Sequence, residues 1–308
     1  MAAACTRATD HDGAPSAAGV VQPSPSESVD DGCSMPDELR PPPPTNALRG
    51  RIAYGQGTSE VMILDLATGR TTQVTSREGS KGWDFDPSFS PDGRSITYRS
   101  EYPDDAEIRM VDLDTGEDRA LTDNLDEDWS PAYSPDGRTI AYATDRGGST
   151  THIAVMPAGG GETTVLARNV QGEYPTWSPD GEQIAFASQV GSGYAIFVVP
   201  VDGSGTPERL TEDSAHNFLP AWSPDGSTIV FQSNRCAKGE RTDLYAMDAD
   251  GSNLRRLTKG FAEQPTWSPD GRWLAFNSFD GLAVMDARGG EARSLGLGTG
   301  TLPDWIDP

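Results

Sequence analysis

The 308-residue chain has few of the residues from which metal centres and disulfide frameworks are built. It contains three cysteines and three histidines, and no Cys-x-x-Cys pair occurs. Three cysteines are too few for a disulfide framework, and the missing pair removes the usual zinc or redox signature. No apolar run approaches the ~18 residues of a membrane-spanning helix. These absences exclude a disulfide-rich scaffold, a Cys-ligated metal site and a transmembrane segment.

Positive charge is also scarce. Lys and Arg number 24 against 47 Asp and Glu, which gives a formal net charge of −23 and a pI near 4.3. The long-range field of such a protein repels nucleic acid and anionic lipid. We therefore expect no nucleic-acid partner, and a cation or the basic surface of another protein is favoured instead.

The first 48 residues lack any apolar periodicity. Stretches such as GAPSAAGVVQPSPSESVDDG and the PPPP at 41–44 cannot offset the entropy of ordering, so residues 1–48 are predicted to be a disordered Pro/Ser-rich tether or a plain tail. The opening MAAAC resembles the end of a bacterial lipoprotein signal. We interpret Cys5 as the lipidated residue of a mature lipoprotein, with Met1 in place of the removed signal; a chance Ala-rich start is the alternative.

Turn-forming residues are abundant, with 34 Gly and 24 Pro, which favours many short strands. The string Ser-Pro-Asp-Gly occurs five times at intervals of about 45 residues. Its copies begin at Ser90, Ser134, Ser178, Ser223 and Ser268. Pro presets φ for a turn, Gly accepts a positive φ, and the Asp side chain can accept backbone hydrogen bonds. The string is therefore predicted to be a hairpin turn rather than a catalytic motif.

Each repeat reads as four short strands separated by turn signals, as in residues 218–258. Four-stranded units of ~40–45 residues in tandem are typical of a β-propeller. Residues 50–75 match a repeat without its first strand, and residues 302–308 match that strand alone. The predicted fold is therefore an all-β, six-bladed propeller over residues 49–308, with four antiparallel strands in each blade. The C-terminal strand completes the first blade and closes the ring.

Six aromatic residues occupy equivalent positions at the ends of the predicted first strands. They are predicted to be core wedges between blades: Phe89, Tyr133, Trp177, Trp222, Trp267 and Trp305.

The strings PTWSPDGEQIAFAS at 175–188 and PTWSPDGRWLAFNS at 265–278 resemble the WD-like repeats of the TolB propeller family. The resemblance covers about residues 49–308. It implies a six-bladed propeller of the bacterial cell envelope that serves as a protein-interaction platform. TolB itself has an α/β domain before its propeller, whereas a Pro/Ser-rich segment stands there in this chain. Similar repeats occur in prolyl-oligopeptidase propellers, where a separate hydrolase domain performs the chemistry.

In a propeller, the loops that lead from one blade to the next open onto one face around the channel, called here the loop face. These loops supply the predicted partner-binding residues: Asp84, Asp86, Asp126, Glu127, Asp128, Trp129, Glu173, Tyr174, His216, Asn217, Glu263 and Gln264. The alternative is that loops of so acidic a chain carry acids by default. Aromatic residues among these acids are either interface anchors or packing under the loops: Trp83, Trp129, Tyr174 and Phe218.

Enzyme functions have weaker support. The propeller contains two histidines, His152 and His216, so a histidine-rich metal site of the oligogalacturonate-lyase kind is excluded. No Gly-x-Ser-x-Gly occurs, which argues against a hydrolase triad. Calcium is the one cofactor that the residues could bind, with Asp84, Asp128, Glu173 and Asn217 as candidate ligands of a lactonase-type hydrolase site. A glycan-binding propeller is a further alternative.

Outside the cytoplasm, Cys33 and Cys236 could pair and pin the tail to the fourth complete repeat. The combined expectation is a monomeric, extracytoplasmic, non-enzymatic propeller whose only membrane contact is a lipid anchor. It binds an envelope or secreted protein with a basic surface through its acidic loop face.

Overall fold

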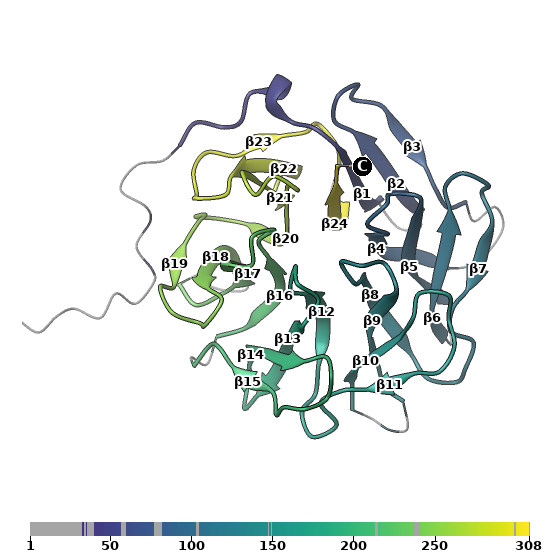
Figure 1. The fold of residues 1–308 in the computed structure, drawn as a ribbon. Coiled ribbons are helices and arrows are strands. Elements are labelled where there is room, and N and C mark those ends of the chain that lie inside the picture. The colour runs from purple at the N-terminus through teal and green to yellow at the C-terminus, as the bar shows by residue number, and fades with distance from the viewer. Residues whose placement is uncertain are drawn as a thin grey trace, which may run out of the picture. The chain divides into compact units, whose positions relative to one another are not determined.

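The computed structural model of the chain describes residues 33, 35, 40–56, 60–76, 82–102, 105–146, 148, 150–212, 215–236, 241–298 and 300–307. Cys5 and residues 1–32 of the predicted tether lie outside this part of the chain. The described residues form six four-stranded antiparallel sheets, which are arranged as blades in a ring (Figure 1). The predicted fold class is confirmed, including the closure of the first blade by the C-terminal strand.

The first three blades contain the following strands, innermost first. Blade 1 consists of β24 (Gly300–Ile306), β1 (Arg51–Gln56), β2 (Glu60–Asp65) and β3 (Thr71–Gln73). Blade 2 consists of β4 (Trp83–Phe89), β5 (Ser95–Tyr102), β6 (Asp105–Asp112) and β7 (Asp118–Ala120). Blade 3 consists of β8 (Asp128–Tyr133), β9 (Thr139–Thr144), β10 (His152–Pro157) and β11 (Thr164–Val165).

The other three blades follow the same order. Blade 4 consists of β12 (Glu173–Trp177), β13 (Gln183–Val190), β14 (Gly193–Pro200) and β15 (Glu208–Arg209). Blade 5 consists of β16 (Asn217–Trp222), β17 (Thr228–Ser233), β18 (Asp243–Asp248) and β19 (Arg255–Arg256). Blade 6 consists of β20 (Ala262–Trp267), β21 (Trp273–Ser278), β22 (Gly281–Asp286) and β23 (Arg293–Ser294). A short 3-10 helix, η1 (Thr45–Ala47), precedes β1.

The core is divided among the junctions between blades, because a single small sheet cannot bury both of its faces alone. Six clusters of buried apolar side chains occur, one at each junction. The six predicted wedge aromatics each join one cluster. Trp177 of blade 4, for example, shares a cluster with Ile153 of blade 3, and its indole Nε1 donates to the carbonyl of Ala132 at 3.0 Å. Trp267 repeats this bond to the carbonyl of Ala221 at 3.0 Å.

The Ser-Pro-Asp-Gly strings form the turns between the first and second strands, as predicted. In blade 4 the buried Ser178 hydroxyl donates to Asp180 at 2.5 Å and accepts from the backbone N–H of Gln183 at 2.9 Å. Gly181 takes φ 75°, a region that is unfavourable for residues with a Cβ. The same serine contacts recur in the other four copies. These turns lie at the opposite ends of the inner strands from the loop face.

Neighbouring turns also touch one another. A Cβ atom placed on Gly226 would lie 3.2 Å from Pro179 in the turn of the preceding blade. At Gly137 the corresponding distance, to Pro91, is 3.3 Å. The repeated string therefore serves both as a hairpin turn and as a contact between blades.

Replacing Ser178 by Ala tests this role of the repeated serine. The change leaves the Gln183 N–H without its acceptor and removes the hydroxyl from Asp180, so we expect Ser178→Ala to lower the free energy of unfolding by about 1–3 kcal/mol. Ser204→Ala, at an exposed position of the same blade, should stay within about 0.5 kcal/mol of the wild type. Urea unfolding measures both, and equal effects would contradict a special role for Ser178.

The segment before β1 lies against the propeller. Cys33 and Cys236 form a disulfide with a Cα–Cα distance of 5.6 Å, and the carbonyl of Cys33 accepts from Arg256 of β19 at 3.4 Å. Arg40 forms a parallel bridge with Gly290, before β23. Leu48 is buried at the junction of blades 6 and 1. The part of the predicted tether that is described therefore contacts blades 5, 6 and 1.

Removal of this disulfide should destabilise the protein, because it closes a loop with a sequence separation of 203 residues. We expect the pair Cys33→Ser and Cys236→Ser to lower the free energy of unfolding by about 2–4 kcal/mol, as chain-entropy arguments predict for a long loop. Cys5→Ser, tested in parallel, controls for the loss of a thiol outside the disulfide. Unchanged unfolding of the double variant in urea would show that the disulfide adds no stability.

No helix among the described residues is both long enough and apolar enough to cross a membrane.

Candidate functional site

The innermost strand of every blade contains an irregular step immediately before a proline. The residue at this step has a positive φ of 40–56° in all six blades, namely Asp86, Ser130, Tyr174, Leu219, Gln264 and Leu302. The pairing register shifts at the same place in each blade. Proline has no N–H to donate, so a bulge here leaves no donor unpaired. Positive φ is uncommon for residues with a Cβ, and such strain is concentrated at functional sites.

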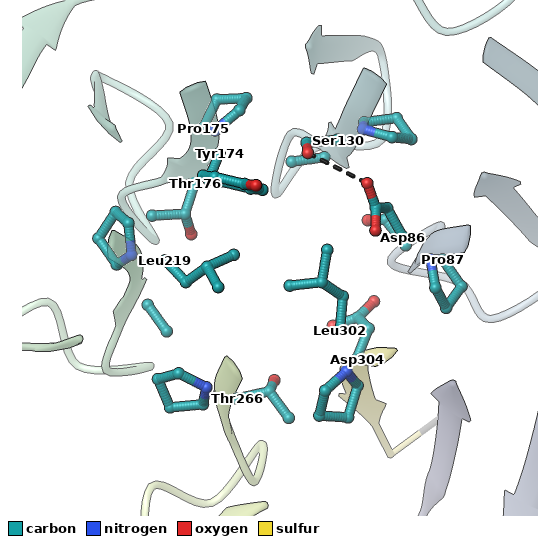
Figure 2. A pocket seen from close by; sticks show the side chains of 17 residues that line it. Asp86, Pro87, Ser130, Tyr174, Pro175, Thr176, Leu219, Thr266, Leu302 and Asp304 are labelled. Carbon is teal, nitrogen blue, oxygen red and sulfur yellow. Dashed lines mark hydrogen bonds between the residues drawn. The ribbon is translucent and has the colours of Figure 1, made fainter. Parts of the chain in front are cut away.

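These bulges border a cavity of about 140 Å³ in the channel. One ring of lining residues consists of five of the pre-proline residues, all except Gln264. A second ring comes two positions later in each strand, nearer the turns, and consists of Ser88, Ala132, Thr176, Ala221, Thr266 and Asp304. Figure 2 shows Leu219, Leu302 and Tyr174 projecting into the middle of this space. No Lys or Arg is among the described residues that line it.

Two carboxylates distinguish one side of the cavity. Asp86 is 9 % exposed and accepts from the Ser130 hydroxyl at 3.2 Å, as Figure 2 shows. Asp304 accepts from the backbone N–H of Phe89 at 2.7 Å, a bond that joins β24 to β4. Burial raises the pKa of each carboxyl to about 6, although Asp304 keeps some accessible area where it lines the cavity. Desolvation disfavours the charged form, and the neighbouring donors offset it only in part.

Three of the four candidate calcium ligands are buried inside the blades. Asp84 and Asp128 are each 1 % exposed, and Asn217 is fully buried. Asn124 donates to Asp128 at 3.0 Å, and Asn217 donates to the carbonyl of Tyr194 at 3.0 Å. Within the described part of the chain, no group of three or more His, Cys, Asp or Glu side chains could hold a metal ion. Asp84, Asp128 and Glu173 therefore do not come together as a calcium site there.

The remaining predicted face residues are divided between exposed and packed positions. Glu127 is exposed, whereas Asp126 and His216 are half-buried. Several support local structure: Trp129 packs against the core between blades 3 and 4, Glu263 accepts from Thr242 at 2.8 Å, and Gln264 accepts from the N–H of Leu302 at 3.0 Å. The structure thus brings Asp86 and Tyr174 to the cavity and leaves most of the other acids around or beneath the loops.

A cluster of aromatic rings lies on the loop face where blades 4 and 5 meet. The ring centroids of Tyr194 and Phe218 are 4.2 Å apart, and Tyr174 meets Phe218 edge to face at 6.2 Å. His216 lies 5.9 Å from Tyr194. Three of these four residues were predicted from the sequence; Tyr194, near the start of β14, was missed.

Large apolar side chains are exposed at one face only among the described residues. They are Trp83, Tyr102, Leu125, Phe261 and Phe279, with exposed fractions of 41, 42, 102, 37 and 84 %. Leu125, Phe261 and Phe279 lie in connections that open onto the loop face, and Trp83 and Tyr102 lie at the strand ends beside such connections. Trp83 was predicted, and the other four were not. Their positions in loop-face turns were the available signal.

Comparison with known proteins identifies the repeat. Residues 49–174 and 165–300 match the TolB beta propeller domain. The chain belongs to the TolB β-propeller family. The TolB-type propeller superposes on the crystal structure of TolB from Acinetobacter baumannii with a TM-score of 0.70 and 24 % identity, over 83 % of this chain and 66 % of that one. Agreement at this identity shows the fold.

Shorter stretches match curated proteins. Over 55 residues, 18 % of this chain and 8 % of its relative, the TolB-type propeller is 44 % identical to dipeptidyl-peptidase 5 of Porphyromonas endodontalis. Over 74 residues it is 35 % identical to the Tol-Pal system protein TolB of Francisella tularensis subsp. mediasiatica, which covers 23 % of this chain and 16 % of that protein. The matched stretches are thus a small part of either relative.

The raised pKa of Asp304 predicts a pH dependence of stability. A carboxyl whose pKa is about 6 in the folded state and near 3.8 when unfolded binds more protons when folded, so its contribution to stability is lost as pH rises from about 4 to about 6. Asp304→Asn should therefore gain stability relative to the wild type across this window, on the order of 2 kcal/mol.

Asp180→Asn is the matched control for this measurement. The Ser178 hydroxyl and the Glu182 N–H hold the pKa of Asp180 below its usual value. The contribution of Asp180 to stability is therefore lost as the pH falls below about 4, and it stays constant across the window in which Asp304 titrates. Urea unfolding from pH 4 to pH 7 gives the difference between each variant and the wild type. A flat difference for Asp304→Asn would show that this carboxyl is not desolvated.

Proposed function

We propose that the TolB-type propeller is a non-catalytic module of the bacterial envelope that binds another protein through its loop face. The observation that carries this proposal is the placement of the exposed large apolar side chains. Trp83 and Phe279 are among five such residues, and all five open onto the same face. Aromatic side chains of this kind are typical anchors of protein interfaces. A protein without a partner rarely exposes several large apolar side chains on one face.

The blade arrangement supports rigid presentation of these anchors. Trp83 begins β4, Phe261 immediately precedes β20, and Phe279 lies in the tight turn between β21 and β22. Blades 2 and 6 both adjoin blade 1, so these three residues flank the closing blade. Loops on a rigid scaffold lose little entropy on binding, which favours affinity. Because this chain has a net charge of −23, we expect its partner to present basic groups around an apolar patch.

The location outside the cytoplasm belongs to the same proposal. The Cys33–Cys236 disulfide favours an oxidising compartment. The matched curated TolB is named as a protein of the Tol-Pal system, which supports an envelope role by family likeness. A lipid on Cys5 would supply the membrane contact, and the propeller would act as a monomer.

Affinity capture with matched variants tests the loop face. The full chain is immobilised and offered an envelope extract beside the pair Trp83→Ser and Phe279→Ser, with Arg272→Ser on the opposite, turn-bearing face as the control. A partner should be retained by the wild type and by the control, and its affinity for the double variant should fall roughly 30-fold, because loss of one central aromatic anchor costs about 2 kcal/mol or more. Equal retention by all three proteins would place the interface elsewhere, and no retained protein would contradict the proposal.

A further inference from the structure

The six blades differ most sharply at one position of the channel. Two residues after the bulge, five blades carry Ser, Ala or Thr, and blade 1 carries Asp304. The neighbouring blade 2 adds Asp86 at the bulge itself. Figure 2 shows Asp86 and Asp304 on the same side of the cavity. A ring built from similar repeats thus has one acidic side. The other five blades accommodate a small residue at the position equivalent to Asp304, so the backbone does not require an acid there.

Neither carboxylate forms an ion pair with a Lys or Arg among the described residues. Asp86 accepts from a hydroxyl and Asp304 from a backbone N–H, and no Lys or Arg nitrogen of the described chain forms an ion pair with either. Arg99 lowers the pKa of Asp86 through its charge, but its guanidinium forms an ion pair with Glu101 at 2.7 Å and does not outweigh the effect of burial. Removing carboxylates from water without a counter-charge is unfavourable. A cation entering the cavity would therefore be stabilised by two groups that are already in position.

The size and the other walls of the cavity select the kind of cation. A volume of about 140 Å³ is well below the ~300 Å³ of a typical small-molecule pocket, so a single side chain fits better than a sugar chain or a cofactor. Leu219 and Leu302 provide apolar surface for a methylene stem, and the Tyr174 ring lies across the cavity from Asp86 (Figure 2). Aliphatic walls with an aromatic ring and carboxylates suit Lys or Arg, whose stems are apolar and whose ends are charged.

We propose that the channel cavity receives the alkylguanidinium or alkylammonium end of a basic side chain from the protein partner, held between Asp86 and Asp304 with its stem against Leu219 and Leu302. This inference rests on the proposed function, because the basic side chain comes from the protein partner. The type of side chain is argued from the residues that line the cavity. The partner would then combine apolar contacts at the loop face with one basic residue that enters the channel.

Calorimetric titration of the full chain with n-butylguanidinium tests the cavity directly. At pH 7.5 and constant ionic strength, the wild type should bind this probe saturably, and the neutral analogue n-butylurea should not bind. Asp304→Asn and Asp86→Asn should each weaken binding at least about tenfold. Asp114→Asn, at an exposed carboxylate in the turn between β6 and β7, should leave it unchanged. Lowering the pH to 5 should weaken binding to the wild type, because both carboxyls become protonated.

Three results of the titration would overturn the inference: no binding of n-butylguanidinium to the wild type, equal binding of n-butylurea, or equal binding to both cavity variants and the wild type. Using two separate carboxylate variants protects the test if one of them fails to fold, which thermal unfolding would reveal. Capture of the partner distinguishes the two proposals. A partner held equally by the wild type and Asp304→Asn would overturn the channel inference and leave the loop-face function standing. Probe binding without any captured partner would do the reverse.

Discussion

The closure of the ring is the constraint on which the rest of this structure depends. No blade buries its apolar faces alone, so each of the six hydrophobic clusters is shared by two neighbours. Closure requires β24, from the end of the chain, to pair with β1, where Trp305 lies opposite Ile52. The same strand carries Leu302 and Asp304 into the channel. The strand that seals the core therefore also completes the cavity, and a loss of closure would remove both together.

A single backbone feature shapes the channel six times. The residue before each inner-strand proline takes a positive φ, and the accompanying bulge displaces the strand register. Because this geometry comes from the backbone, the side chain at that position can vary: it is acidic at Asp86, aromatic at Tyr174 and aliphatic at Leu219. A constant scaffold with variable inward-facing residues is how one fold supports different ligands, so the chemistry of the site has to be argued from its residues.

Aspartate behaves in opposite ways at the two ends of the inner strands. In the turns, a serine hydroxyl and a backbone N–H stabilise the carboxylate of Asp180 and lower its pKa, and solvent is close by. In the channel, burial dominates and raises the pKa of Asp86 and of Asp304 to about 6. The turn carboxylates therefore stabilise hairpins. In the channel, burial disfavours the charged form of the carboxylates, and a bound cation would stabilise that form.

The sequence by itself determined the propeller, because its period, its turn chemistry and its aromatic positions are local or strictly repeated. The count of six blades followed from matching residues 50–75 with 302–308, and the Ser-Pro-Asp-Gly turns followed from the φ preferences of Pro and Gly. These features depend on short-range patterns or on their repetition, which a linear sequence records. The pairing of Cys33 with Cys236 was one possibility in the sequence, and the structure decided it, because it joins residues 203 positions apart.

Only the tertiary structure decided which acids face solvent, which are buried and which reach the channel. Asp84 and Asp86 are two residues apart and looked equivalent in the sequence, yet Asp84 lies inside its blade and Asp86 lines the cavity, because the bulge before Pro87 changes the direction of the strand between them. Asp304 was not recognised, since its importance comes from its position beside Phe89, which is distant in the chain. The burial of an acidic side chain, and its position near other side chains in the channel, depend on many contacts between residues that are distant in the sequence. Spacing along the chain therefore does not reveal them.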